Sequence, residues 1–172
     1  MKKIMFAATL FVASLSQPVF ADDWGCKVLL CLSNPSGPEA VSQCVPPIER
    51  LWNELRHGHP FPSCDTGSSS YANNTWSSGS YCTLSLVQLN PSAPTDPSSA
   101  TCNAQGSIDV SVGGVLNTRV WWGVGGGAST TTLVETAAAG TLSYDPSLAV
   151  SVAVAAEVAR EAAAAGGSGY AP

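Results

Sequence analysis

The chain has 172 residues, and its 7 basic and 12 acidic side chains give it a formal net charge of −5. Such a chain is poorly suited to bind nucleic acid or an anionic membrane surface, because both are held by clustered lysines and arginines. The length suits one domain with a modest core. Large apolar side chains are few, which predicts long and irregular connections.

Residues 1–21 have the three parts of a secretory signal peptide. Met1-Lys2-Lys3 gives a positive start, Ile4–Leu15 is an apolar run, and Ala21 is a small residue at the expected cleavage point. The run is too short and wrongly flanked for a transmembrane helix. We expect cleavage after Ala21 and, because the signal has a bacterial form, a periplasmic location. Residues 22–172 then carry 5 basic against 12 acidic side chains, so the mature chain is more acidic still.

Residues 22–122 are predicted to form one disulfide-bonded domain that begins with helices. A clear break at residues 33–37 follows the first helix, and Pro38 with Glu39 is suited to start a second one. The apolar residues of the first helix recur at helical spacing and are Trp24, Val28, Leu29 and Leu32.

A further helix is predicted after Pro46-Pro47, because proline is tolerated in the first turn of a helix. Gly58 is placed to end it. Its apolar residues fall at i, i+3, i+4 and i+7 and are Ile48, Leu51, Trp52 and Leu55. Its solvent side is expected to hold Glu49, Arg50, Asn53 and Glu54. Two apolar helices joined by a short turn predict a helical hairpin.

Six cysteines in an exported chain predict three disulfides. None of them has the Cys-x2-Cys spacing of a zinc site. A hairpin folded near Gly37 brings Cys31 opposite Cys44. The proline-extended segment 58–64 can return Cys64 to Cys26 on the first helix. Cys82 and Cys102 flank a Pro/Ser-rich loop. Among the several connectivities that six cysteines allow, this geometry favours Cys31–Cys44, Cys26–Cys64 and Cys82–Cys102.

Strand patterns replace helical ones after residue 66. Tyr81–Val87 is a predicted strand, and Ile108–Val112 and Val115–Trp122 alternate on either side of Gly113-Gly114. Alternation around a Gly-Gly pair is a strong β-hairpin pattern. The fold class is therefore predicted as α+β, with an N-terminal helical hairpin before a short antiparallel β region.

Residues 123–172 form a Gly/Thr/Ala-rich extension with little capacity for a core. Alternating apolar residues from Leu148 to Val154 favour a strand, whereas the alanines of 157–165 favour a helix, and both alternatives stay open. The uncharged stretch 146–156 is well short of the ~20 residues that span a bilayer, so we expect no transmembrane segment in the mature chain. A frayed tail is expected from Gly166.

The sequence indicates no active site, cofactor or metal. His57 and His59 could hold a metal only with a third ligand that is not evident, and Glu49 with Glu54 could form the acid pair of a glycosidase. Glu49, Glu54, Asp65, His57 and His59 are all expected to face solvent. No Gly-x-Ser-x-Gly or Cys-x-x-Cys motif is present. We therefore predict that the protein is not an enzyme.

Three tryptophans are candidates for contacts with a partner: Trp76, Trp121 and Trp122. Adjacent residues of a strand point to opposite faces. We therefore expect one of Trp121 and Trp122 to fill the core and the other to be exposed.

Several segments also stand in a characteristic order: Cys26–Ser33, Cys44, Ile48–Leu51, Gly58–Cys64 and Arg119–Trp122. Over residues 24–122 this order resembles the TrbM/KikA family of conjugal-transfer proteins. The resemblance implies an exported accessory of plasmid mating-pair formation, that is, of type IV secretion, which acts through protein components of the conjugation apparatus. It carries over no catalytic residue.

Two other classes of function remain open alongside conjugation. One is a peptidoglycan-binding or cell-wall-lytic accessory that lets the apparatus cross the wall. The other is a secreted disulfide-rich toxin or inhibitor. Partly buried acids in a cleft would favour a lytic enzyme, and a flat apolar patch with an exposed tryptophan would favour protein contacts.

Overall fold

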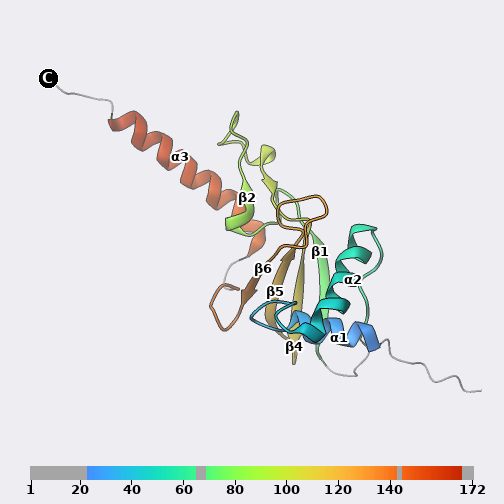
Figure 1. The fold of residues 1–172 in the computed structure, drawn as a ribbon. Helices are drawn as coiled ribbons and strands as arrows, with labels where there is room; N and C mark the ends of the chain where they lie inside the picture. The colour runs from blue at the N-terminus through green and yellow to red at the C-terminus, as the bar shows by residue number, and fades with distance from the viewer. Residues whose placement is uncertain (1–22, 65–68, 143–144, 168–172) are drawn as a thin grey trace, which may run out of the picture.

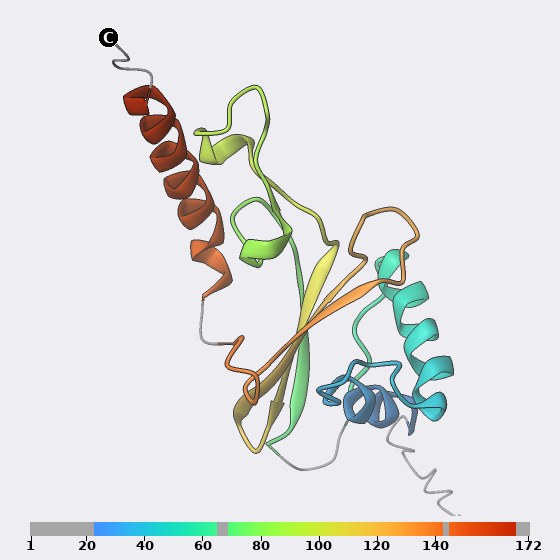
Figure 2. The same cartoon turned by 60° about the vertical axis from the view of Figure 1, so that its left-hand side comes forward.

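The structure, a computed structural model, describes residues 23–64, 69–142 and 145–167. The expected signal peptide, Asp65 and residues 168–172 lie outside this part of the chain. The fold is α+β, as predicted: two helices pack on one face of a four-stranded antiparallel sheet, and a third helix projects away from it (Figures 1 and 2).

The two N-terminal helices follow their predicted apolar patterns. Helix α1 spans Asp23–Leu32 and helix α2 spans Val45–Arg56, with prolines in its first turn. The prediction of a helix from Pro38 is wrong. The segment makes successive i→i+3 turns and then a 3-10 helix, Ser42–Cys44. These turns return the chain to α1, where Cys44 is bonded to Cys31. The apolar side of α2 is fully buried and consists of Ile48, Leu51, Trp52 and Leu55.

Three disulfides join the pairs that the sequence geometry favours. Two of them close the helical part of the molecule, and the third closes the loop between two short strands. Disulfides of this number are typical of proteins from oxidising compartments. The pairs are Cys26–Cys64, Cys31–Cys44 and Cys82–Cys102.

The sheet has the strand order β1-β4-β5-β6, with every neighbouring pair antiparallel. Its centre is the predicted hairpin, β4 (Gly106–Val112) and β5 (Val115–Trp122). Gly113 and Gly114 both have positive φ, +61° and +81°, which is the conformation that a two-residue hairpin turn of this kind requires. The outer strands, β1 (Tyr71–Trp76) and β6 (Thr132–Thr136), were not predicted, so the sheet continues beyond Trp122.

The predicted strand Tyr81–Val87 is wrong. Residues Leu84–Leu86 form a 3-10 helix, and only Val87–Gln88 (β2) pairs, with Thr101–Cys102 (β3). The segment is held instead as a cover on the second face of the sheet. Its anchors are the Cys82–Cys102 disulfide and a hydrogen bond from the Cys82 amide to the carbonyl of Pro146.

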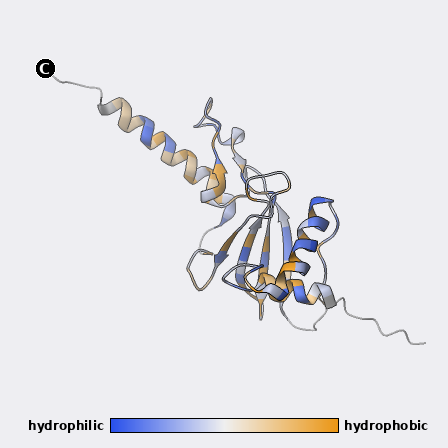
Figure 3. Cartoon of the chain, in the orientation of Figure 1, coloured by the Kyte–Doolittle hydropathy of each residue, from blue (hydrophilic) through white to orange (hydrophobic). Residues whose placement is uncertain are grey.

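Apolar side chains fill both faces of the sheet. On one face, residues of α1 and α2 meet Ile108, Val110, Val120 and Trp122, and the apolar sides of the two helices point toward the sheet (Figure 3). On the other face, a smaller cluster contains Cys82, Leu86, Ala104 and Trp121. The hairpin β4–β5 is therefore covered on both sides.

Helix α3 spans Ala149–Gly167 and settles the alternatives for the C-terminal segment. The alternating residues from Leu148 to Val154 do not form a strand. Ala149 and Val150 are buried against the rest of the molecule, while the helix beyond them projects outward (Figure 2). Within the described residues, no helix combines the length and apolar character needed to cross a membrane.

Candidate functional site

The structure separates the three candidate tryptophans. Trp121 and Trp122 are 0% and 1% exposed, so the expectation that one of them faces solvent is wrong. They do point to opposite faces of β5, as strand geometry requires, but both faces are covered at this point. Trp122 stacks on Trp52 of α2, with ring centroids 6.2 Å apart, and Trp121 contacts Tyr81 on the other side. Neither ring can meet a partner.

Trp76, at the end of β1, is 54% exposed and remains a candidate for binding. Its ring meets Trp122 edge-on, with centroids 5.3 Å apart and planes at 65°. Trp122 is itself fixed, because its indole N–H donates to the side-chain oxygen of Asn74 at 2.8 Å. An exposed ring that rests on a buried, hydrogen-bonded ring has few orientations open to it.

A row of polar side chains crosses the second face of the sheet. Asn73, Asp109, Arg119 and Glu135 are cross-strand neighbours, one from each of the four strands. Arg119 donates to both carboxylate oxygens of Asp109, at 2.6 and 3.0 Å, and lies 3.9 Å from Glu135. Burial opposes the charge of Arg119, but the hydrogen bond and the negative charge of Asp109 outweigh it and raise the pKa of Arg119 above its ordinary value.

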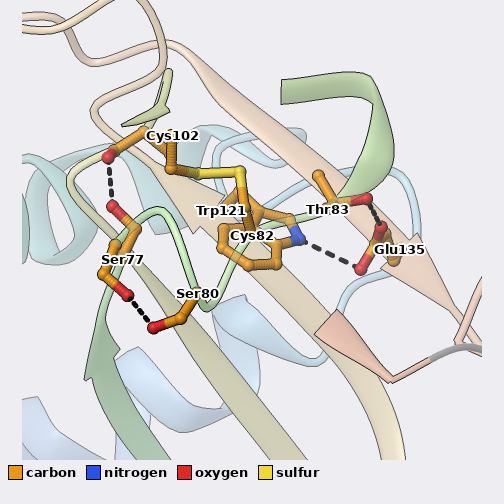
Figure 4. The surroundings of a disulfide bond; sticks show 9 residues. Ser77, Ser80, Cys82, Thr83, Cys102, Trp121 and Glu135 are labelled. Carbon is orange, nitrogen blue, oxygen red and sulfur yellow. Dashed lines mark hydrogen bonds between the residues drawn. A yellow bond between two sulfur atoms is a disulfide. The ribbon is translucent and has the colours of Figure 1, made fainter. Parts of the chain in front are cut away.

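Glu135 holds the cover of this face in place. Its carboxylate accepts hydrogen bonds from the Thr83 hydroxyl at 2.5 Å and from the Trp121 indole N–H at 3.0 Å (Figure 4). The three residues are all buried. Because its oxygens already have two donors and a nearby guanidinium, Glu135 has a structural role between the sheet and the segment above it.

The acids and histidines near the end of α2 lie at the surface, and Glu54 and His59 are paired locally. Glu54 lies beside Arg50 at 3.9 Å and accepts a hydrogen bond from His59, while Glu49 and His57 are exposed. Among the described residues, no three His, Cys, Asp or Glu side chains are grouped so that they could hold a metal ion. Asp65 lies outside the described residues.

Sequence reasoning missed the pair Asp109–Arg119 because of one irregularity. Counting outward from the Gly113-Gly114 turn places Asp109 opposite Thr118. The register shifts between Val110 and Ser111, so Asp109 instead faces Arg119. A β-bulge of this kind inserts one residue in one strand, and the only sequence signal for it is that the shift pairs opposite charges.

Comparisons with known proteins add no relative: no family model, curated protein or solved structure matches this chain.

Proposed function

We propose that the protein is an exported accessory of a conjugative mating-pair-formation system, related to type IV secretion, that acts through protein contacts in the periplasm. The proposal rests on the resemblance to the TrbM/KikA family over residues 24–122. The three disulfides support export to an oxidising compartment.

One observation carries this proposal: the scattered segments of the resemblance are packed together in space. Trp52 follows the Ile48–Leu51 segment directly and stacks on Trp122, which lies 70 positions further along the chain. The segment Gly58–Cys64 is bonded back to α1 through Cys26–Cys64. The segments that carry the resemblance are therefore parts of one packed unit, in which each supports the burial of the others.

Helix α3 is the contact element that we propose for a protein partner. Val152 and Val158 are exposed, and Leu148, just before the helix, is 54% exposed. The charged residues of the helix are few, and two of them, Glu157 and Arg160, form an ion pair with each other. A projecting helix with exposed apolar side chains suits a hydrophobic groove on a partner protein.

The test is a deletion of the gene in a conjugative donor, with transfer frequency and sensitivity to pilus-specific phage both scored. We expect the deletion to lower transfer and the wild-type gene to restore it. An unchanged transfer frequency in the deletion strain would refute the proposed function.

Single substitutions in the complementing gene then separate contact from catalysis. Val152→Glu, on the exposed side of α3, should abolish complementation at an unchanged periplasmic protein level. Glu54→Gln should complement fully, because Glu54 has only surface partners. A Glu54→Gln protein that is present at the normal level but lowers transfer a thousandfold would indicate an enzyme and overturn the contact proposal.

A further inference from the structure

Trp76 stands at the rim of an open groove of about 440 Å³. This volume is within the range of ~300–1,000 Å³ that small-ligand sites occupy. The groove runs between the end of β1 and strand β3 and is lined in part by Cys102. The disulfide of Cys102 with Cys82 is shown in Figure 4. The other residues that line it are small or neutral and include Ser77, Ser78, Gly79, Thr101, Ala104 and Gln105.

A second groove of the same size, about 440 Å³, adjoins the first at Gly79. A side chain at Gly79 would place its Cβ 2.2 Å from the carbonyl oxygen of Ala100, so the two backbones are in direct contact where the grooves meet. The second groove reaches the first turns of α3. Its lining combines four serines, Ser80, Ser98, Ser147 and Ser151, with the apolar side chains of Pro97, Ala100 and Val150.

The chemistry of the two grooves is neutral throughout: no charged side chain lines either of them. Two carboxylates adjoin the second groove through its serines: Asp96 accepts hydrogen bonds from Ser98, and Asp145 accepts one from Ser147. These hydrogen bonds lower the pKa of both carboxyls, so both are ionised at neutral pH. Neither groove therefore offers a charged side chain to pair with an ionic ligand.

We propose that these grooves bind a neutral glycan strand, with one sugar ring stacked on Trp76. Sugars present an apolar C–H face to an aromatic ring and hydroxyl groups to hydroxyl and amide partners, and the grooves supply both kinds of group. Thr101 and Gln105 line the same groove as Trp76 and carry a hydroxyl and an amide, and the side-chain amide N–H of Gln105 also donates to the carbonyl of Gly127. Two grooves in succession suit a chain of sugars better than a single monosaccharide.

The ring of Trp76 is prepared for stacking before a ligand arrives. Its edge-on contact with Trp122 limits its rotation, and Trp122 is held by Trp52 and Asn74. A group that is already ordered loses little entropy on binding. A protein partner is less well matched, because the centre of a protein interface usually buries large apolar or arginine anchors in desolvated pockets, and these grooves are open and lined mostly by small residues.

The glycan inference goes beyond the proposed role in conjugation and can fail or hold independently of it. It is tested with purified mature protein and the tetramer of N-acetylglucosamine, a neutral oligosaccharide, by isothermal titration and tryptophan fluorescence. A cellulose-derived tetramer and isolated peptidoglycan sacculi, as further probes, distinguish a general glycan site from one for cell-wall sugars. We expect saturable binding of the N-acetylglucosamine tetramer.

Matched variants assign the binding to the groove. Trp76→Ala should weaken binding about tenfold or more, whereas Trp76→Phe should retain part of it. Tyr71→Ala is the control, because Tyr71 is at the other end of β1 and is similarly exposed, at 50%. Thr101→Glu is a second groove variant that buries no charge, since Thr101 is exposed, and it should also abolish binding.

Unfolding midpoints in urea show whether each variant is folded. No binding of any of the three glycan probes at millimolar sugar would overturn the inference. Equal affinities of the wild-type and Trp76→Ala proteins would overturn it too, as would loss of binding in Tyr71→Ala at an unchanged unfolding midpoint. Capture of a protein of the conjugation apparatus through Trp76, with no glycan binding, would assign the ring to a protein contact instead.

Discussion

Replacing Glu135 by leucine tests whether this buried acid is structural. The carboxylate is the acceptor for two buried donors, the Thr83 hydroxyl and the Trp121 indole N–H. Each buried donor left without a partner costs about 1–3 kcal/mol, so Glu135→Leu should lower the free energy of unfolding by about 2–6 kcal/mol. Loss of the neighbouring charge beside Arg119 acts in the same direction.

The same reasoning predicts a reversal of sign at Thr83. In the wild-type protein, Thr83→Val removes a hydrogen bond to a charged group and should destabilise by about 1.5–3 kcal/mol. In the Glu135→Leu background the hydroxyl is already unpaired, so Thr83→Val should restore stability. Urea unfolding with the disulfides intact, followed by tryptophan fluorescence, measures all four proteins of this cycle. Equal costs of Thr83→Val in both backgrounds would show that the two side chains do not depend on each other.

Three further predictions concern the helical module, the disulfides and the start of α3. Trp52→Ala should lower the free energy of unfolding by about 3–5 kcal/mol, because a fully buried ring is lost. Glu54→Ala should change it by only about a few tenths of a kcal/mol. Equal costs in urea unfolding would contradict the placement of α2. All six cysteines should resist alkylation without reduction, and two or more labels in the intact mass would refute three disulfides. The amide and hydroxyl of Ser147 lower the pKa of Asp145 from its ordinary 3.8, so the stability from this contact is present above about pH 4 and lost as the pH falls further. Asp145→Ala should therefore show a smaller drop in unfolding midpoint between pH 5 and about pH 2 than the wild type, and an equal drop would rule this contact out.

The parts of the fold that the sequence predicted are those where local patterns and final contacts agree. Helix α2 has a complete apolar side and prolines at its start, and the β4–β5 hairpin has alternation around a Gly-Gly turn. The disulfide pairs were also accessible, since a short turn and a proline-extended return limit which cysteines can meet. In each case the information lies within about 40 residues of sequence.

The parts that were missed depend on contacts between distant segments. Strand β1 consists mainly of polar residues and β6 lies in a Thr-rich segment, so neither has the apolar alternation that predicts a strand. Both form strands because the edges of β4 and β5 are available for pairing. Tyr81–Val87 has the alternation but is held by Cys102, Pro146 and Glu135 as a cover. The burial of Trp121 follows from that cover, which the sequence did not reveal, while Trp122 is buried on the other face against α2.

A chain of three tryptophans connects the helical module to the groove at the end of β1. Trp52, in the module that carries the resemblance, stacks on Trp122, and Trp122 in turn supports the exposed ring of Trp76. Trp122 can do so because its ring is buried against α2 and also meets Trp76 of β1. The helical module therefore has a second consequence besides stability: it fixes the ring at the groove. A chain that kept the sheet but lost α2 would present Trp76 on a mobile support, and the groove would lose the ordered aromatic face on which we propose that a sugar stacks.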